Sequence, residues 1–369
     1  MKALLVLKDG TVYTGSASGT RGVYVGEVVV NTKMVGYDQV ITDPAYFGQL
    51  VVMTYPLIGN YGINFNDLES KTCRLAGLIL DRRSRIYSNW RAEEDLATFL
   101  EEQGVPFLTG VDTRALALKL RETGPQLGAI VCGDMDVAEV LDQLRTQPVS
   151  AGSALDVTCA EAYQYAPGIG NPYHVVVLDL GVTNSQLRQL RELGLRVTVV
   201  PAGTSGADIR RLAPHGVFLS SGPGSPQQIP AVVGTVRELL PYLPIFGVGL
   251  GHLVLGSALG METQPLTVPH RGANYPVKEL STGKLAITEQ NHGYVLDQKS
   301  VPPDVTVSHV NLVDETIEGI VSKDYQAFGV QYTPVYIEGD VSPEFRKFYA
   351  MLVNSVGARE GCDTNAQTD

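Results

Sequence analysis

Hydrophobic and polar positions alternate along the first part of the chain in a way that predicts β-strands. Residues 4–7 and 11–13 are apolar segments on either side of a polar Lys-Asp-Gly turn, and this arrangement predicts a β-hairpin. Residues 23–30 predict a further strand by the same criterion. These strands open the region 1–150, which we interpret as the first domain.

Amphipathic helices are predicted after these strands. Residues 92–103 place their leucine and phenylalanine side chains on one face, and Asp112 can cap a helix that runs to residue 121. Asp136 and Glu139 have the spacing of a capping box ahead of another apolar face. Strands followed by helices predict an N-terminal α+β domain.

Regular spacing is lost between residues 151 and 172, where glycine, proline and tyrosine accumulate. This composition is typical of a linker, so we expect a second domain at 173–357. The polar residues 358–369 predict a disordered C-terminal tail.

Fully apolar strands alternate with amphipathic helices in the second domain. Such strands are typical of a parallel sheet covered by helices on both faces, so the predicted fold class is α/β, with a doubly wound, mostly parallel second domain. Ligands bind such sheets at the carboxyl ends of the strands. The expected strands are 174–180, 195–200, 217–219 and 245–248, with the first helix at 184–193.

Composition and charge narrow the class of protein. The chain has 369 residues, a net charge of -11 and a hydrophobic content of 44%. This acidity argues against nucleic acid as a partner, which would favour a basic stripe. The N-terminus lacks the features of a signal peptide, and the longest apolar stretch, 245–260, is interrupted by His252 and several glycines. We therefore expect a cytoplasmic protein that does not span a membrane.

The four cysteines have no spacing that suggests joint chemistry. Cys73, Cys132, Cys159 and Cys362 are scattered, without a CxxC pair, and this favours reduced thiols over disulfides. No pattern of metal ligands is visible, so no metal site is predicted.

Gly249 lies where a nucleophile would be expected. The apolar strand 245–248, a glycine-rich turn and an apolar helix over 252–259 predict a strand-turn-helix elbow. Such an elbow exposes one side chain beside helix N-terminal amides that can receive an oxyanion. Because Gly249 has no side chain, the turn predicts the geometry of an acyl-transfer site without its nucleophile.

Three further segments can contribute to this site. The segment SSGPGSP at 220–226 follows a strand, and Gly222 and Gly224 allow a positive φ that turns amides into a pocket. It is equally consistent with a turn that only reverses the chain. The segment QNHGY at 290–294 offers amide and imidazole groups on an expected turn, and 328–336 reads as a strand followed by a proline-containing loop.

Taken together, these segments resemble the class I glutamine amidotransferases, and the whole chain resembles the small subunits of carbamoyl phosphate synthetases. In the first domain the resemblance depends on residues 30–44 and 54–62, and on VDTRAL at 111–116. In the second it depends on 217–226, the elbow, and 287–294. The first-domain motifs are specific, because other amidotransferases lack that domain.

The resemblance implies a thiol mechanism in which an elbow cysteine attacks the glutamine carboxamide, a histidine activates it and a glutamate orients the histidine. In this chain the cysteine position is Gly249, the histidine position is Thr333 and the glutamate position is Val335. All three members of the triad are therefore replaced.

Two substrate-holding positions implied by the resemblance are also replaced. The glutamine after the elbow histidine falls on Leu253, and a serine of the first domain falls on Ala45. The remaining positions serve mainly through backbone or generic contacts. They are Gly222, Gly224, Leu250, Asn291, Gly293 and Tyr294.

The resemblance leads to one favoured hypothesis and two alternatives. The favoured hypothesis is a non-hydrolysing small subunit that pairs with a large subunit using free ammonia for carbamoyl phosphate, a precursor of arginine and pyrimidines. ATP and Mg²⁺ would belong to that large subunit, and we expect no cofactor in this chain. The first alternative is a stand-alone pseudoenzyme paralogue whose vacated pocket holds glutamine or another metabolite. The second is a glutaminase rescued by a relocated nucleophile, for which Ser221 or Ser225 with His252 or His292 are the nearest candidates.

Overall fold

A computed structural model describes residues 1–147, 152–167 and 170–365 of the chain. The chain forms two compact units, Met1–Gly152 with Leu266–Ala273, and Ser153–Pro265 with Asn274–Asp369. The first unit therefore includes a short segment from the long strand β15 (Thr263–Glu279), which no sequence pattern indicated.

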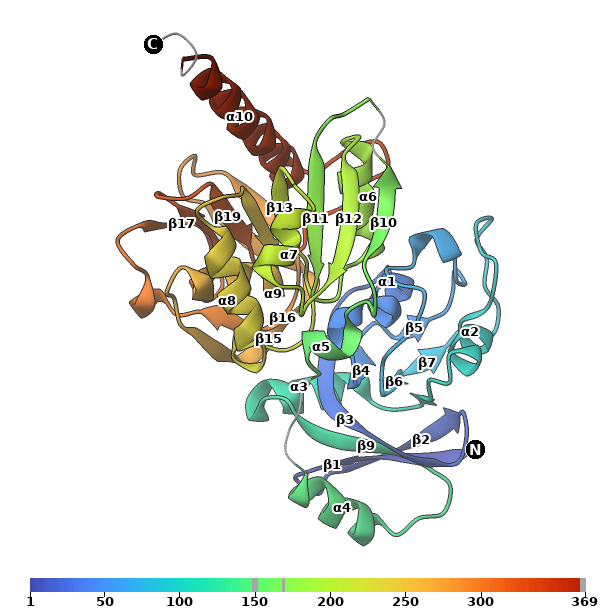
Figure 1. Cartoon of the computed structure of the whole chain (residues 1–369). Helices are drawn as coiled ribbons and strands as arrows, with labels where there is room; N and C mark the ends of the chain where they lie inside the picture. Colours follow the sequence, from blue (N-terminus) through green and yellow to red (C-terminus); the bar gives the residue numbers. More distant parts are fainter. Residues whose placement is uncertain (148–151, 168–169, 366–369) are drawn as a thin grey trace. The chain divides into compact units, whose positions relative to one another are not determined.

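Seven strands of the first unit close into a barrel (Figure 1). The predicted hairpin is confirmed, since β1 and β2 pair antiparallel with Lys2 opposite Ser16. Strand β9 pairs with both β1 and β3, and this double pairing closes the barrel, which the sequence pattern did not predict. In barrel order the strands are β1 (Lys2–Leu7), β2 (Val12–Ser18), β8 (Phe107–Thr109), β6 (Gly77–Ile79), β4 (Gln49–Met53), β3 (Gly22–Asn31) and β9 (Gln126–Cys132).

Aspartate residues cap the three longest helices of the first unit. The Asp112 carboxylate accepts the amide of Ala115, and the Asp136 carboxylate accepts that of Ala138, as expected for N-caps. Asp95 caps the helix predicted at 92–103, which therefore begins later than expected. The helices are α1 (Tyr37–Thr42), α2 (Leu96–Glu102), α3 (Thr113–Thr123) and α4 (Val137–Thr146), with short elements η1 (Pro44–Tyr46), β5 (Leu57–Ile58), η2 (Phe65–Asp67) and β7 (Arg82–Arg83).

The second unit is built on a ten-stranded sheet in the order β10-β12-β11-β13-β14-β19-β18-β17-β15-β16. Its central strands, from β12 to β19, are parallel, as the sequence predicted, and antiparallel strands extend it on both sides. The strands are β10 (Tyr163–Pro167), β11 (His174–Asp179), β12 (Arg196–Pro201), β13 (Gly216–Leu219), β14 (Ile245–Val248), β16 (Leu285–Leu296), β17 (Val305–Asn311), β18 (Ile317–Ser322) and β19 (Ala327–Val330).

Helices cover both faces of this sheet. Successive side chains of a strand point to opposite faces, and because both sets are apolar here, both faces must be covered. Along β11, Val176 and Leu178 belong to a core shared with α8 and α9, whereas Val175 and Val177 belong to a core shared with α6 and α10. The predicted α/β fold class is thereby confirmed. The helices are α5 (Ala154–Val157), α6 (Asn184–Glu192), α7 (Gly206–Arg211), α8 (Pro230–Leu239), α9 (Leu250–Ala258) and α10 (Pro343–Asn365), with short η3 (Pro226–Gln228) and η4 (Gln298–Ser300).

The segment expected to be a linker contains regular structure. A capping box between Ser153 and Asp156 starts α5, and β10 pairs antiparallel with β12 at the edge of the sheet. The segment 151–172 was expected to be a linker without regular structure, and this is wrong for the residues of α5 and β10. Neither element needs hydrophobic periodicity, because a local capping box starts the helix and pairing with the edge of the sheet forms the strand. Residues 148–151 and 168–169 lie outside the described residues.

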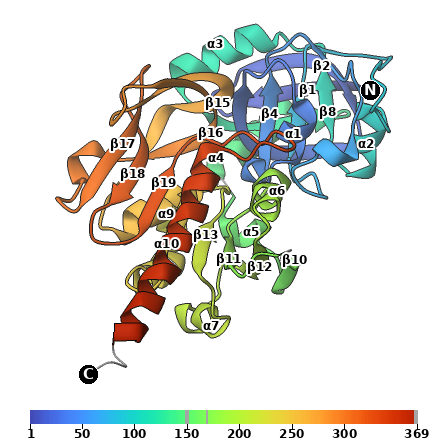
Figure 2. The same cartoon turned by 90° about the horizontal axis from the view of Figure 1, so that it is seen from above.

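Helix α10 also extends beyond its predicted end. It continues to Asn365, into the segment 358–369 expected to be disordered, because no proline after Pro343 interrupts its backbone hydrogen bonds. Its last turns project away from the sheet (Figure 2). Residues 366–369 lie outside the described residues. Within the part of the chain that the structure describes, no helix combines the length and apolar character needed to cross a membrane.

The packing of α10 on the aromatic side chains of the sheet can be tested by mutation. Phe345 is fully buried, with its ring centroid 5.2 Å from that of Phe218 and 5.3 Å from that of Phe246. We expect Phe345→Ala to lower the free energy of unfolding by about 3–5 kcal/mol, since it removes buried contacts and leaves a cavity. Urea denaturation measures the free energy of unfolding of both proteins. The control Val353→Ala, at a partly exposed position of the same helix, should change the value by less than about 0.5 kcal/mol, and equal losses for both variants would contradict the packing.

Candidate functional site

The elbow predicted around Gly249 is present between β14 and α9. Gly249 has φ 57° and ψ -115°, and it is the N-cap of α9. This backbone conformation is strained for residues with a side chain. As the first residue of α9, Leu250 carries an amide with no acceptor inside the helix. The turn therefore places helix N-terminal amides beside a position that has no side chain.

Two further glycines are required for the elbow to form. A Cβ on Gly247 would overlap the carbonyl oxygen of Gly251, and a Cβ on Gly251 would overlap the carbonyl oxygen of Leu219. Helix α9 can therefore approach β13 and β14 this closely only without side chains at both positions. Glycine at 247 and at 251 follows from this approach, whereas glycine at 249 suits the positive φ of the turn.

Backbone hydrogen bonds tie the elbow to the neighbouring strand ends. The amide of Gly249 donates to the carbonyl oxygen of Val330 over 3.0 Å, and the amide of Gly251 donates to that of Ser220 over 3.0 Å. The segments after β13, β14 and β19 therefore meet at the carboxyl edge of the parallel strands, where sheets of this type bind ligands.

The loop after β13 needs its two glycines for different reasons. Gly224 has φ 87°, as predicted. Gly222 has no positive φ, so its predicted reason was wrong. A Cβ on Gly222 would instead overlap the carbonyl oxygen of Leu180. This contact lies between two loops that are distant in the sequence, and only the tertiary structure reveals it.

A side chain at position 249 would have room. A Cβ built there lies 3.4 Å from the Cβ of Ser221 and 4.0 Å from the carbonyl oxygen of Gln331, which are ordinary contacts. The hydroxyl of Ser221 accepts a hydrogen bond from the Gln186 side chain over 3.0 Å. The vacated position is thus bordered by Ser221, whose side chain is held by a buried glutamine that sequence reasoning missed.

The positions that the resemblance assigns to the other two triad members lie in the loop after β19. The amide of Thr333 donates to the carbonyl oxygen of Glu289 over 2.9 Å, and the Val335 side chain is 53% exposed. Gln189 of α6 holds this loop, because its side chain donates to the carbonyl oxygen of Pro334 and accepts the amide of Ser342. Gln189 is fully buried, and a glutamine on an apolar helix face was the only sequence signal for it.

The segment QNHGY lies inside strand β16, so the expectation of a turn was wrong. Pairing in the sheet overrides the turn preference of Asn291 and Gly293. His292 is buried, and its ring nitrogens lie 3.0 Å from the carbonyl oxygen of Tyr294 and 2.9 Å from the side-chain oxygen of Gln290. Both nitrogens are therefore engaged within the strand, and Tyr294 itself packs against the core.

A buried carboxyl group lies in the same part of the sheet. Glu318 accepts hydrogen bonds from the side-chain amides of Gln290, over 2.9 Å, and Asn311, over 3.1 Å. Burial raises the pKa of Glu318 to about 7, and the two hydrogen bonds oppose the rise only in part. The sequence pattern gave no indication of this group.

His252 does not supply a usable base. Its side chain is fully buried, and this burial lowers the pKa of the imidazole to about 3. Leu250 and Leu253 belong to the hydrophobic core beneath the sheet. Leu253 therefore replaces a predicted polar substrate contact by a core side chain.

The described cysteines are poor nucleophiles. Burial raises the pKa of Cys73 and of Cys159 to about 12, and it also raises the pKa of Cys132. All three thiols therefore stay protonated near neutral pH, whereas thiolates are the reactive form. The side chain of Cys362 lies outside the described residues. In the first unit, Ala45 is 8% exposed in η1 and offers only a methyl group.

Chemically, the second unit offers backbone amides around an open position. The amide of Leu250 and the glycine loop at 220–226 can stabilise a negative or polar oxygen. Positions 249, 333 and 335 carry no thiol, imidazole or carboxylate. Backbone amides of this kind can hold a small polar group.

Family models match both parts of the chain. Residues 5–130 match the model of the carbamoyl-phosphate synthase small chain, CPSase domain, and residues 176–349 match that of class-I glutamine amidotransferases. Among solved structures, a glutamine amidotransferase from Thermotoga maritima is similar with a TM-score of 0.37 and 16% identity, over 54% of this chain and 87% of that one.

Curated relatives are similar over nearly the whole chain. A carbamoyl phosphate synthase small chain from Akkermansia muciniphila is 42% identical, over 96% of this chain and 98% of its own. A carbamoyl phosphate synthase pyrimidine-specific small chain from Halalkalibacterium halodurans is 42% identical, over 93% of this chain and 94% of its own.

The close approach at Gly222 generates one test of the site. We expect Gly222→Ala to lower the free energy of unfolding by roughly 3 kcal/mol, because the added methyl group must displace the backbone of Leu180. Urea denaturation is the measurement. Gly203→Ala is the control, since a Cβ at Gly203 meets nothing within 4 Å. A Gly222→Ala protein as stable as the control would show that the two loops are not in contact.

The buried carboxyl group generates a test with pH. The pKa of Glu318 is raised from 4.5 to about 7 in the folded chain, so its contribution to stability is full below pH 4.5 and is lost as pH rises through about 7. This group alone should lower the free energy of unfolding by roughly 3 kcal/mol over that range. Glu318→Gln should remove this dependence, whereas the exposed control Glu338→Gln should keep it. Parallel pH profiles for all three proteins, measured by urea denaturation, would contradict the assignment.

Proposed function

The chain belongs to the carbamoyl phosphate synthase small chain family, and on that premise we propose that it is a small chain that has lost glutamine hydrolysis. The observation that carries the proposal is the elbow at Gly249, whose backbone geometry is formed and whose nucleophile is missing. Loss of a nucleophile alone lowers the rate of such enzymes on the order of 10⁶-fold.

The other replaced positions support the same proposal. Thr333 has a hydroxyl group that does not titrate near neutral pH, and Val335 cannot orient a base. Because a thiol needs its base, restoring one position would not restore activity. The replacements at Leu253 and Ala45 further reduce the contacts available to a glutamine substrate.

The partner in this proposal is a carbamoyl phosphate synthase large chain that uses free ammonia. The names of the relatives, which are small chains, support a large-chain partner. ATP and Mg²⁺ would bind to the large chain, and this chain would contribute to its folding or activity. We also propose a cytoplasmic location, supported by the free thiols of Cys73, Cys132 and Cys159.

A stand-alone role in metabolite binding is the second candidate. It is favoured by the space at Gly249, where a Cβ would meet only Ser221 and the carbonyl oxygen of Gln331, and which lies next to the helix N-terminal amide of Leu250. A rescued glutaminase is a weaker third candidate, because His252 is enclosed and neutral and His292 is engaged at both nitrogens. The three candidates differ in what they predict for glutamine and for the large chain.

The decisive measurement is carbamoyl phosphate synthesis by the reconstituted complex, with glutamine or ammonia as the nitrogen source. We expect synthesis from ammonia and none above background from glutamine, since no thiol is present at the elbow. Glutamate release by the chain alone should also stay at background. Glutamine-dependent synthesis would refute the proposal, and failure to bind any large chain would favour the stand-alone candidate.

A reversion series tests the chemical reason. The triple variant Gly249→Cys, Thr333→His, Val335→Glu should release glutamate above background, because it restores a nucleophile, a base and an orienting acid. Gly249→Cys alone should not. Gly249→Ala is the matched control, since it adds the same Cβ and backbone strain without sulfur. Equal glutamate release from the Gly249→Ala and triple variants would show that the restored groups play no part.

A further inference from the structure

Helix α6 carries two buried glutamines that form hydrogen bonds outside the helix. Gln186 and Gln189 are three residues apart, so they lie on one face of α6, and they are 1% and 0% exposed. Burial of a polar side chain is costly unless the group is hydrogen-bonded. Gln186 donates to the Ser221 hydroxyl over 3.0 Å, in the loop after β13, whereas Gln189 bonds to the loop after β19. One face of α6 therefore holds two loops of the candidate site.

Gln189 joins the two ends of the segment 334–342. Its side-chain nitrogen donates to the carbonyl oxygen of Pro334 over 3.2 Å, and its side-chain oxygen accepts the amide of Ser342 over 2.9 Å. A side-chain amide offers a donor and an acceptor next to each other, whereas a carboxylate lacks the donor and a hydrocarbon lacks both. The contacts therefore depend on the chemical identity of residue 189.

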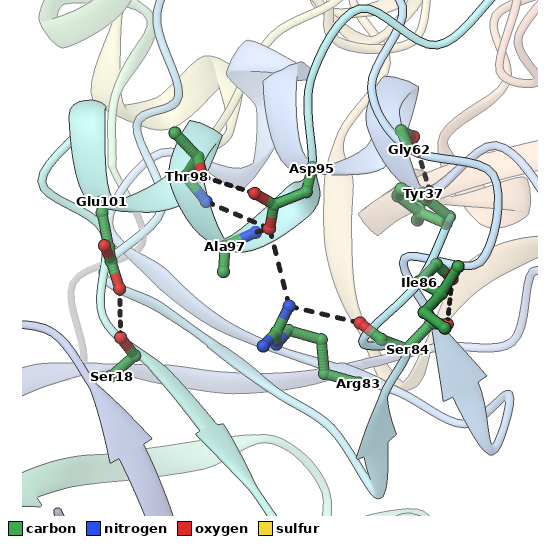
Figure 3. A network of polar contacts seen from close by, with 10 residues as sticks. All are labelled: Ser18, Tyr37, Gly62, Arg83, Ser84, Ile86, Asp95, Ala97, Thr98 and Glu101. Atoms are coloured by element: carbon green, nitrogen blue, oxygen red, sulfur yellow. Dashed lines mark hydrogen bonds and ion pairs between the residues drawn. The ribbon is translucent and has the colours of Figure 1, made fainter. Parts of the chain in front are cut away.

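This long-range role differs from that of the side chains that begin helices. Asp95, for example, accepts the amides of Ala97 and Thr98 at the start of its own helix α2 (Figure 3). Such a cap satisfies backbone groups two or three residues away. Gln189 bonds to backbone groups that are 145 and 153 residues away in the sequence, so it stabilises tertiary rather than local structure.

The segment 334–342 is buried at its two ends and mostly exposed between them. Residues 335–340 are exposed or partly exposed. In this part the Tyr336 hydroxyl donates to the carboxylate of Glu192 on α6 over 2.5 Å, and Arg346 forms an ion pair with Asp340. Exposed polar contacts of this kind contribute little to stability. The two buried hydrogen bonds at the ends therefore do most to fix the path of the segment.

The segment begins close to the vacated position of the elbow. The carbonyl oxygen of Gln331 lies 4.0 Å from a Cβ built at Gly249. Position 333 follows two residues later, at most about 7 Å along an extended chain. Pro334, the next residue, is the one that Gln189 holds at the start of the segment. A side chain at 333 can therefore face one at 249 only while the segment keeps this path.

We propose that Gln189 is a positioning residue, which holds the segment 334–342 on α6 and thereby keeps position 333 within reach of position 249. Without its amide, the buried carbonyl oxygen of Pro334 and the buried amide of Ser342 regain hydrogen-bond partners from water when the segment lifts off the helix. This role depends on the geometry of the second unit alone, so it holds with or without a large chain.

Amide hydrogen exchange of the full chain tests this role directly. Gln189→Leu should speed exchange of the Ser342 amide about 10-fold or more, because this amide loses its acceptor. Gln189→Glu keeps that acceptor and removes only the donor to Pro334, so exchange at Ser342 should stay slow. Gln186→Leu is the matched control. It removes the same group from the same helix face, but that group serves the other loop, so it should leave exchange at Ser342 unchanged.

A thiol–imidazole pair measures whether position 333 stays within reach of position 249. The double variant Gly249→Cys, Thr333→His is alkylated with iodoacetamide over a range of pH, and mass spectrometry follows the reaction at position 249. We expect the pKa of the introduced thiol to lie at least about one pH unit below its value in Gly249→Cys alone, because a nearby imidazolium stabilises the thiolate. Adding Gln189→Leu or Gln189→Glu should return this pKa to the value in Gly249→Cys.

Val236→Ala is the control for a general loss of stability, because Val236 is a fully buried residue of α8 in the core on the other face of the sheet. It should destabilise the double variant and leave the lowered thiol pKa unchanged.

Three outcomes would overturn the proposal. They are unchanged exchange at Ser342 in Gln189→Leu, a lowered thiol pKa that persists after Gln189→Leu, and a double variant whose thiol pKa equals that in Gly249→Cys. Because these measurements use neither glutamine nor a large chain, the proposed function stands or fails separately.

Discussion

The close approach of helix α9 to strands β13 and β14 is the constraint on which the second unit's candidate site depends. It is possible only because Gly247 and Gly251 have no side chains where backbone oxygens of Gly251 and Leu219 come nearest. The same approach lets the amide of Gly251 reach the carbonyl oxygen of Ser220, which joins the elbow to the glycine loop. The absence of side chains at these two positions therefore permits the approach, and backbone hydrogen bonds hold the helix N-terminus in place.

The backbone geometry of the site is therefore independent of the side chains at its expected reactive positions. The elbow, the glycine loop and the end of β19 are positioned by backbone contacts, which do not depend on the identity of the side chains at 249, 333 and 335. A chain can therefore lose a thiol, a base and an acid at these positions and retain the fold around them. Under the proposed function, this independence explains how the elbow stays formed although position 249 carries no side chain.

Buried polar side chains hold the loops at the carboxyl edge of the parallel strands in place. Gln189 holds the loop that follows β19, and Gln186 holds Ser221. Glu318 accepts hydrogen bonds from two side-chain amides, which offset only part of the rise in its pKa that burial causes. These groups must be satisfied because unpaired polar atoms are costly away from water. In the first unit, by contrast, the large apolar side chains of Ile86 and Trp90 are exposed to water.

The sequence by itself determined the order and kind of most elements. Period-two and helical spacing predicted β1, β11 and β14, and aspartate caps located α3 and α4, because these signals are local. The prediction that Gly249 stands at a nucleophile position also came from the sequence, since it depends on residue identity in a motif. Only the tertiary structure decided the closure of the barrel by β9, the placement of QNHGY inside β16, and the reason for glycine at 222. Each of these depends on a contact between segments distant in the chain, which local spacing does not encode.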